Sequence, residues 1–552
     1  MLLLLLLLLR PPPCAGCQAS SFTECQVAPF VAGHDLAGEG FDVVTMKTTG
    51  AGVVDLKTFM VGGVKGNCTV CHNRLLQQTQ KLPAAVRDWK VKVQCKRHIT
   101  SKIFDSSQSV MKEEGSSVNR SWKVGLKIGG LAGFATGGSH SDTTKFVESR
   151  SKRDKSSFLT HHFQCEYYSL QLRSSPPLTE DFQKSLNNLP STHYHRNTSA
   201  FRRFISTYGT HFIRGVTLGG RLHAITAVRT CEAAMGAMSA HTVGTCLSVE
   251  ASATIGFISS ENSVKFCNEK MKSLRNATAF SRAFSDRMSS VSGGDGDVSD
   301  VLFGDGGAAA YLKWLRSLKR VPGVVSYWIS PLHQLVTDNP MLRSTLQDAI
   351  SDYIRRRAKS LQCPASCPIG HRTPSCACRC HGHRMVDANC CPAAPGVARL
   401  GVTVVRAEGL WGDDFTRTDG YVKVRYGAHG ATTPVVWNDD FPQWNYQIHF
   451  GSVNLGGNLP VRFEVWDRDH AWDDDLLGSA SVFPTAGGKP ERRFRLKHGA
   501  LIIRLTVQCA PSLQGALCQQ YAPSPARVER WGSGWSAAEE GASRFSTRDK
   551  MK

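Results

Sequence analysis

An acidic stretch in the C-terminal third of the chain carries the side chains best suited to chemistry. Residues 466–475, WDRDHAWDDD, are half aspartate, and Asp413 and Asp419 form a second acidic pair upstream. The chain as a whole is basic, with 66 Lys and Arg against 45 Asp and Glu and a net charge of +21. Because crowded carboxylates repel one another, the cluster predicts a bound cation, and hard cations prefer oxygen ligands.

The elements around these acids predict how they are positioned. Short alternating runs between residues 396 and 509, such as YVKVRYG and VRFEVWD, predict an all-β sandwich, and both acidic stretches fall in loops between the strands. The motifs TDGYVKV (418–424), FPQWN (441–445), FEVWDRD (463–469) and DDLLG (474–478) resemble those of the C2 domain, a calcium-dependent lipid-binding sandwich. The resemblance implies Ca²⁺ as the cofactor. The implied ligands are Asp413, Asp419, Asp467, Asp469 and Asp475, with Asp474 as a further candidate.

Two tryptophans flank the acidic loops. Trp411 precedes the first acidic pair, and Trp472 lies inside the second stretch. Aromatic tips beside a bound cation suit insertion at a lipid interface, which predicts membrane contact by both side chains. The alternative is that the aspartates are ordinary turn residues and the tryptophans belong to the core.

A second specific stretch, YGTHFIRGVTLGG (208–220), lies in the large N-terminal part of the chain. It resembles the signature of the membrane-attack-complex/perforin (MACPF) family. No nucleophile or acidic partner is spaced around His211, and GGSHS (137–141) lacks the glycine of a nucleophile elbow, so an enzyme is not expected. Gly219 and Gly220 are interpreted as a flexible bend in a sheet, because glycine tolerates strained backbone.

Residues 361–391 are dense in cysteine, which predicts a segment held together by disulfides. A zinc site at Cys378, Cys380, His381 and His383 is the alternative, disfavoured in an oxidising compartment. The segment has an odd number of cysteines, so one needs a partner elsewhere in the chain. The family resemblance implies disulfides, with the pairing left open, among Cys95, Cys165, Cys231, Cys363, Cys367, Cys376, Cys378, Cys380, Cys390, Cys391, Cys509 and Cys518.

The predicted fold class is multidomain. Its expected parts are a signal peptide (1–16), an α+β MACPF domain with a bent antiparallel sheet and helical clusters (17–360), an EGF-like disulfide-rich module (361–395), an all-β C2 sandwich (396–509) and a polar tail (510–552). This order of parts resembles perforin-type members of the family along nearly the whole mature chain.

The N-terminus predicts a secretory route. Eight leucines follow Met1, a run too short to span a bilayer and typical of a signal peptide. Four sequons, at Asn67, Asn119, Asn197 and Asn276, agree with glycosylation of a secreted protein. Secretion makes nucleic acid the poorer partner for the excess positive charge, and an anionic membrane the better one.

Two segments, about 121–163 and 247–290, could cross a membrane as strands. Apolar residues alternate with polar ones over Trp122, Val124, Leu126 and Ile128, and over Leu247, Val249, Ile255 and Phe257. The second run has roughly the length of a tilted transmembrane strand. Just beyond it, Val264, Cys267, Met271 and Leu274 recur at helical spacing. The alternative is an ordinary half-buried strand followed by an amphipathic helix. The resemblance implies helical clusters that unwind into β-hairpins.

The leading hypothesis is a secreted, calcium-triggered pore-forming cytolysin. Since lipid does not tolerate open strand edges, many copies must close a barrel, so the chain itself is an expected partner besides the phospholipid membrane. The resemblance implies storage in cytotoxic granules, a multi-pass barrel in the target membrane, and granzymes as cargo. The competing hypotheses are a calcium-dependent lipid tether that never inserts and a lipid hydrolase.

Overall fold

The computed structural model describes residues 16–524 except 62–65, 118–119, 192–197, 275–276, 296–299, 364–366, 368, 413–415 and 470–473. Several predicted positions lie outside the described residues: Asp413, Trp472, Asn119, Asn197, Asn276, most of the signal peptide and most of the tail. The chain divides into two compact units. The first comprises Met1–Ser151, Ser156–Val228 and Ala240–Pro364, and the second Lys152–Lys155, Arg229–Ser239 and Ala365–Lys552.

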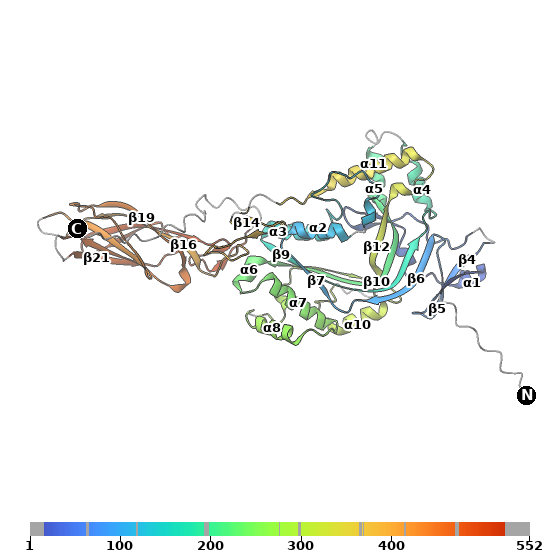
Figure 1. Ribbon diagram of the computed structural model, residues 1–552, viewed down its shortest axis with the longest axis horizontal. Helices are drawn as coiled ribbons and strands as arrows, with labels where there is room; N and C mark the ends of the chain where they lie inside the picture. Colours follow the sequence, from blue (N-terminus) through green and yellow to red (C-terminus); the bar gives the residue numbers. More distant parts are fainter. Residues whose placement is uncertain are drawn as a thin grey trace, which may run out of the picture. The chain divides into compact units, whose positions relative to one another are not determined.

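A large sheet forms the centre of the first unit (Figure 1). Its main order is β3-β2-β10-β9-β6, with β11 and β12 pairing with β10 and β7 pairing with β9. The strands are β2 (Glu39–Asp42), β3 (Lys47–Gly52), β6 (Val86–Cys95), β7 (Thr100–Phe104), β9 (Ser156–Leu172), β10 (His211–Arg229), β11 (Arg287–Ser292) and β12 (Gly323–Pro331). β9 and β10 are buried on both faces over most of their length, because helices cover both sides.

Two groups of helices cover opposite faces of this sheet (Figure 1). The first group is α2 (Ser107–Ser117) and α3 (Asp142–Arg153), and the second is α7 (Ala240–Thr254), α8 (Glu261–Lys272) and α9 (Phe280–Ala283). Phe158 of β9 packs with Val110 and Phe146 of the first group. The next residue, Leu159, lies beside Gly244 of the second group. Because successive side chains of a strand point to opposite faces, the two groups sit on the two sides of β9.

The remaining elements of the first unit complete its core. Helices α4 (Glu180–Asn187), α5 (Thr198–Tyr208), α10 (Gly307–Ser317) and α11 (Pro340–Arg357) pack on the sheet. A small sheet joins β1 (Cys17–Ser20), β4 (Cys68–Asn73) and β5 (Gln78–Lys81), with α1 (Phe22–Val27) beside it, and β8 (Phe134–Ala135) pairs with β13 (Lys359–Ser360). Within the described residues, no helix combines the length and the apolar character needed to span a bilayer.

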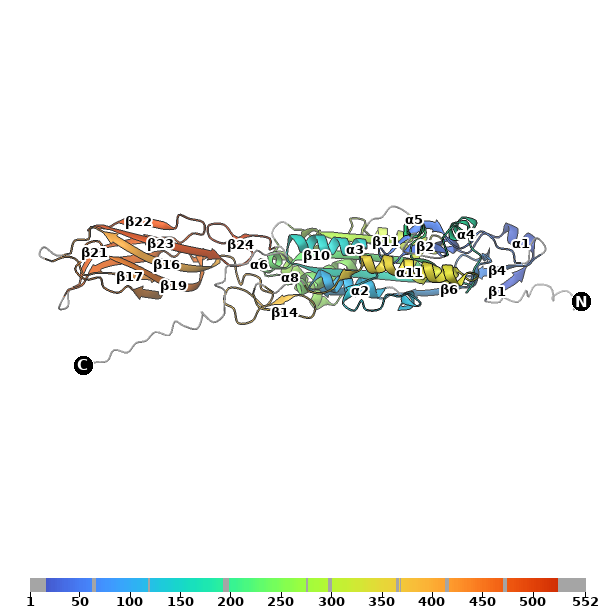
Figure 2. The same cartoon turned by 90° about the horizontal axis from the view of Figure 1, so that it is seen from above.

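The second unit contains a sandwich of two sheets within its described part (Figure 2). One sheet has the order β19-β16-β23-β22 and the other β18-β17-β20-β21. Their bounds are β16 (Val397–Glu408), β17 (Gly420–Tyr426), β18 (His429–Thr432), β19 (Gln443–Asn454), β20 (Val461–Asp467), β21 (Asp475–Val482), β22 (Glu491–Arg495) and β23 (Ala500–Cys509). The inward positions of β16, β17 and β20 form its apolar core, as alternation predicts.

Disulfides hold the cysteine-rich part of the second unit. β14 (His371–Arg372) pairs with β15 (Cys378–Arg379), and β24 (Leu513–Gln514) with β25 (Gln520–Tyr521). Cys367 is bonded to Cys378 and Cys380 to Cys390, so the alternative of a zinc site at Cys378 and Cys380 is excluded. Cys363 and Cys376 are also disulfide-bonded, and Cys509 is bonded to Cys518.

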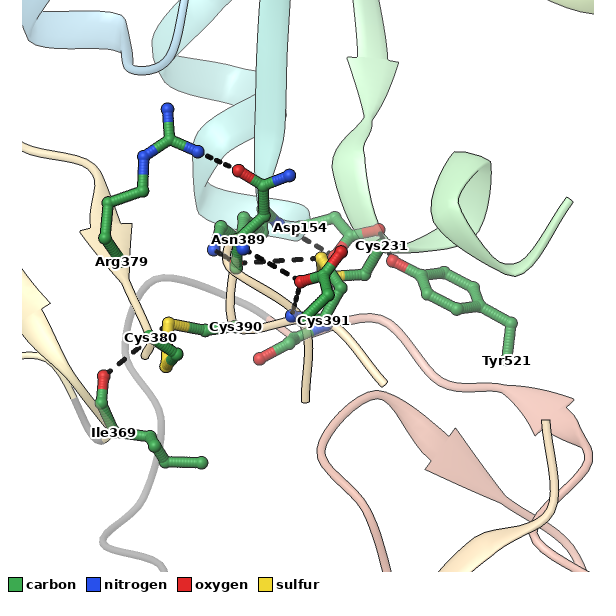
Figure 3. Close-up of a disulfide and its surroundings, with 12 residues drawn as sticks. Asp154, Cys231, Ile369, Arg379, Cys380, Asn389, Cys390, Cys391 and Tyr521 are labelled. Carbon is green, nitrogen blue, oxygen red and sulfur yellow. Dashed lines mark hydrogen bonds between the residues drawn. A yellow bond between two sulfur atoms is a disulfide. The ribbon is translucent and has the colours of Figure 1, made fainter. Parts of the chain in front are cut away.

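The remaining cysteine of this segment, Cys391, is bonded to Cys231 of α6 (Thr230–Met235), as Figure 3 shows. Beside this bond the Tyr521 hydroxyl donates to the Asp154 carboxylate. These contacts explain why residues 152–155 and 229–239 group with the second unit, although the sequence assigns them to the large N-terminal domain.

Candidate functional site

The acidic loops meet at the ends of three neighbouring strands of the sandwich. Gly420 of β17 pairs with Asp467 of β20, and Asp467 pairs in turn with Asp475 of β21. Asp467 is buried, with 2% of its surface exposed, whereas Asp475 is exposed. Directly opposed residues share one face of a sheet, and like charges in that arrangement repel. A cation between the loops would remove this repulsion.

The buried carboxylate of Asp467 organises the loops around it. Its Oδ1 accepts a hydrogen bond from the backbone N–H of Asp419 at 2.6 Å. A Cβ atom added to Gly412 would lie 1.7 Å from its Oδ2, so the loop that carries Trp411 passes directly over the carboxylate. Asp419 accepts at its own Oδ1 from the backbone N–H of Asn438 at 2.7 Å. The site therefore depends on a glycine where the first loop crosses the third.

Asp474 has a different set of contacts from Asp475. The Tyr421 hydroxyl donates to Asp474 Oδ2 at 2.5 Å, and the backbone N–H of Asp469 donates to its Oδ1 at 3.3 Å. The bond from Tyr421 is the main cause that lowers the Asp474 pKa. Burial, followed by the same bond, raises the pKa of Tyr421 to about 12. Asp474 thus has hydrogen-bond partners within the site, while Asp475 is the residue placed opposite Asp467, and Asp474 stays a predicted ligand.

The chemistry of these donors fits Ca²⁺. The residues brought together are aspartates, which supply only oxygen ligands, and no cysteine or histidine that would favour zinc takes part in the contacts above. Among the described residues, no group of three acidic, histidine or cysteine side chains is already gathered at metal-binding distance. Asp413, the remaining predicted ligand, lies outside the described residues.

Exposed aromatic side chains gather at the same end of the sandwich. Trp411 is 57% exposed and meets the His498 ring edge-on at 5.3 Å, so it is not a core residue. Trp437 and Phe441 are also exposed, at 58% and 62%. The backbone N–H of Leu410 donates to the carbonyl of Asp440 at 2.9 Å, which brings the Trp411 loop beside Phe441. Sequence reasoning missed Trp437 and Phe441, although Phe441 begins the FPQWN motif and Trp437 lies four residues before it.

His211 of the signature is a structural residue in this fold. Its side chain is fully buried between two partners. Its Nε2 donates to the carbonyl of Trp122 at 3.0 Å, and its Nδ1 accepts from the Thr210 hydroxyl at 2.7 Å. Burial lowers the His211 pKa to about 3, so the ring is neutral at physiological pH. The signature thereby fastens the start of β10 to the first segment proposed to insert.

Gly219 and Gly220 are required by close packing on both sides of β10. A Cβ on Gly219 would lie 2.0 Å from the carbonyl oxygen of Cys165, and one on Gly220 would lie 2.4 Å from the Trp314 ring. β12 has a register irregularity against β10 at the neighbouring Thr217–Leu218 step. Because neither glycine has a side chain, β9 and α10 can pack closely against β10 near the point where its pairing with β12 shifts register.

We expect Gly220→Ala to destabilise the protein by about 1–3 kcal/mol, because the added methyl group must displace Trp314. Gly129→Ala is the matched control, since a Cβ there meets no heavy atom within 4 Å. Thermal melting of the two variants measures the difference. Equal melting temperatures would show that the sheet absorbs the methyl group and that close packing does not explain this glycine.

In the first segment predicted to insert, about residues 121–163, some residues are buried in the core and others belong to a strand. Trp122 is 1% exposed and Ile128 is 9% exposed, whereas Val124 is 60% exposed. Residues 156–163 of the predicted helical cluster belong to β9 of the central sheet, so that part of the prediction is wrong. The strand is fixed there because Phe158, Leu159 and Phe163 are buried in the packed sheet.

The second predicted segment is helical here, although its sequence alternates. α7 buries Val243, Leu247, Ala251 and the following Ile255, an i, i+4 row that faces the sheet. The Ser248 hydroxyl lies 3.1 Å from His161 Nε2, and burial lowers the His161 pKa to about 4. Phe257 meets the Phe163 ring at 5.8 Å. The segment satisfies a helical period and a strand period at the same time, and packing on the sheet selects the helix.

The other predicted positions are placed as follows. Cys95 is bonded to Cys165 across β6 and β9. Three disulfides absent from the predicted set also occur: Cys17–Cys71, Cys25–Cys68 and Cys246–Cys267. Cys267 fits the apolar spacing of a helix, so its sequence position alone does not indicate a disulfide. Asn67 is exposed, as a glycosylation site requires.

Comparison with known proteins agrees with this architecture. Residues 30–360 match the MAC/Perforin domain family and residues 398–493 the C2 domain family. The chain is 39% identical to human Perforin-1, covering 92% of this chain and 93% of that protein, and 38% identical to mouse Perforin-1 over 92% and 94%. A solved structure of GNIP1Aa from Chromobacterium piscinae aligns with a TM-score of 0.44 at 13% identity, covering 90% of this chain and 92% of that one. The chain therefore belongs to the MAC/Perforin family of pore-forming, non-enzymatic proteins and carries a C2 domain.

Proposed function

We propose that this protein is a secreted, calcium-dependent pore-forming cytolysin. Its C2 loops bind Ca²⁺ through Asp413, Asp419, Asp467, Asp469 and Asp475 and then engage a phospholipid membrane. Copies of the chain assemble into a ring, and two segments of each copy insert as β-hairpins. By analogy with the perforin relatives, the protein is stored in cytotoxic granules and its pore admits granzymes.

The observation that carries the proposal is the connection of the two helical groups to the sheet. α2 and α3 lie between β7 and β9, and α7 to α9 lie between β10 and β11. In both cases the flanking strands are antiparallel neighbours. Each group therefore occupies the place of a hairpin tip, and unwinding it would lengthen two paired strands at once. Extended at about 3.3 Å per residue, residues 227–256 would reach about 100 Å beyond the sheet.

The physics of the bilayer accounts for the ring. Lipid offers no hydrogen-bond partner for an open strand edge, so only a closed barrel is stable there. Two hairpins from one chain give four strands, fewer than the eight of the smallest barrels. Release of dye from phosphatidylcholine–phosphatidylserine vesicles tests the function. We expect release with calcium and none with chelator, while calcium-dependent binding without release would support the lipid-tether alternative.

The exposed aromatic residues should act after calcium. We expect Trp411→Ala to weaken vesicle binding roughly tenfold, because burying a large apolar side chain contributes about 1.5–3 kcal/mol. Calcium affinity, measured by calorimetry without lipid, should stay nearly constant, since the indole is 57% exposed and supplies no oxygen ligand. A collapse of calcium affinity would instead assign Trp411 a role in shaping the loop.

A further inference from the structure

The disulfide between Cys246 and Cys267 lies inside the segment proposed to unwind. It joins α7 to α8, with the two Cα atoms 5.4 Å apart. A covalent bond between two helices would ordinarily lock them together and oppose their conversion to strands. Whether it does so here depends on where the two cysteines would stand in the resulting hairpin.

The existing pairing of β10 and β11 sets the register of that hairpin. Arg221 pairs with Ser292 and Thr226 with Arg287, with no irregularity between them. The next pair outward already exists, since the backbone N–H of Ala227 donates to the carbonyl of Asp286 at 2.8 Å. Stepping outward in this register, one residue on each strand at a time, places Cys246 directly opposite Cys267.

The geometry of that position suits a disulfide. Ala227 and Asp286 form a hydrogen-bonded pair, and the two types of pair alternate along an antiparallel ladder. Counted from there, Cys246 and Cys267 occupy a non-hydrogen-bonded pair, in which Cα atoms lie about 4.5 Å apart. This separation is within the range that a disulfide spans.

The same register predicts a favourable turn. It pairs Ile255 with Ile258 and leaves Gly256 and Phe257 as a two-residue loop. A two-residue hairpin loop of type II′ takes glycine at its first position. Gly256 already has a positive φ of 74°, and a Cβ there would meet no atom within 4 Å.

The register also keeps charged side chains off one face, on which Ser260 and Asn262 are the polar residues. One face of residues 247–266 pairs Leu247 with Phe266 and Val249 with Val264. Every charged residue of the stretch lies on the opposite face: Glu250, Glu261 and Lys265. That face also holds the two cysteines. Each strand between the disulfide and the turn has roughly the 9–11 residues that cross a bilayer.

We propose that the Cys246–Cys267 disulfide survives the change from helices to strands and fixes the register of a transmembrane hairpin whose turn is Gly256–Phe257. The disulfide lies on the lumen face, at the end of the hairpin that is nearer to the rest of the protein. The inference rests on the proposed insertion of this segment. It replaces the expectation that Ile255 lies at mid-bilayer, because Ile255 adjoins the turn.

Thiol labelling of the full-length protein tests survival of the bond. Pores are assembled with calcium on phosphatidylcholine–phosphatidylserine vesicles, treated with N-ethylmaleimide and digested for mass spectrometry, with dye release recorded on the same sample. We expect the disulfide-linked peptide and no labelled Cys246 or Cys267. Because a disulfide opens to thiols only with a reductant, a parallel sample receives dithiothreitol before calcium. Dye release that requires the reductant, with Cys246 and Cys267 labelled, would show that the bond is a lock, and would overturn the inference while leaving the proposed function intact.

Engineered cysteine pairs test the register. In the background Cys246→Ser with Cys267→Ser, Ser248→Cys with Lys265→Cys stands in register, and Ser248→Cys with Ser263→Cys is displaced by two residues. In the helical form Ser248 contacts His161, Lys265 pairs with Glu261 and Ser263 contacts Ser260, so the members of each pair have different partners. Oxidation before assembly is the baseline for both pairs. Diagonal neighbours lie about 7–8 Å apart, beyond easy disulfide reach.

With copper-phenanthroline and oxygen as oxidant, we expect the in-register pair in assembled pores to cross-link at least about tenfold faster than the displaced pair. Equal or reversed rates in pores that release dye would overturn the register. Absence of dye release from wild-type protein both with and without the reductant would overturn the proposed function and this inference together. Labelling of the wild-type disulfide decides the matter even if the engineered variants fold poorly.

Discussion

Asp467→Asn should abolish calcium-dependent binding to vesicles and, with it, lysis. The substitution removes the buried charge at the centre of the loops but keeps a side-chain oxygen that can accept from the Asp419 N–H. Loss of an outer partner of a metal costs roughly 10–100-fold in affinity, and loss of a direct charged ligand should cost more. Sedimentation with phosphatidylserine vesicles across a calcium titration measures the effect.

Asp439→Asn is the matched control for this experiment. Asp439 lies beside the loops, but its Oδ1 accepts from the Phe441 N–H at 2.8 Å, a contact that asparagine can keep. We expect its vesicle binding to match the wild type. If Asp467→Asn binds and lyses like the control at every calcium concentration, Asp467 does not hold the cation.

Acid should act on the wild type as Asp467→Asn does at neutral pH. Carboxylates must be deprotonated to bind a metal, so calcium affinity falls as pH falls and protons compete for the ligands. The calcium concentration for half-maximal vesicle binding should therefore rise as the pH is lowered from 7 towards about 4, where aspartates ordinarily take up protons. A calcium requirement independent of pH over this whole interval would contradict binding through aspartates.

Ala253→Arg should stop insertion without disturbing the soluble fold. Ala253 is exposed in the helical form, and in the hairpin register it lies on the apolar face, between the middle of the span and the turn. A basic residue facing lipid costs up to about 2–4 kcal/mol at mid-bilayer and less towards the interfaces, and a ring repeats the cost in every copy. We expect dye release to fall to background while calcium-dependent binding persists.

Ser252→Arg supplies the neighbouring control, because its side chain would face the watery lumen. Melting curves of both variants come first, so that a folding defect is not mistaken for failed insertion. Ile255 is unsuitable for this test, since it is 4% exposed in the soluble form and a charge there would disrupt the core. Lysis by Ala253→Arg at the wild-type rate would show that this face does not meet lipid.

Local sequence patterns were enough to predict the C2 loops and the family. Acidic residues at fixed spacing around strand motifs are local features, so TDGYVKV and FEVWDRD predicted both the sandwich and the place of Asp467. Alternation likewise predicted the strands of the sandwich core. Such patterns persist in the sequence because each strand must present apolar residues to one side.

Features that depend on neighbours distant in the chain required the folded structure. Trp437 and Phe441 are candidates for membrane contact because their side chains are exposed, which the sequence does not show. The hydrogen bond from the Tyr421 hydroxyl distinguishes the contacts of Asp474 from those of Asp475. The alternative of a zinc site is excluded because Cys378 and Cys380 are disulfide-bonded, and composition alone cannot assign such pairings.

The segment around α7 shows most clearly what sequence periodicity cannot decide. Leu247, Ala251 and Ile255 fit both a helical row and a strand face, so periodicity alone could not choose between them. Packing against the sheet decides for the helix in the soluble protein, because that row is buried there. The proposed alternative strand, with its register through Cys246 and Cys267, depends on the pairing of β10 with β11, which the sequence does not reveal. A sequence can encode two local structures, and the contacts available in each environment select one of them.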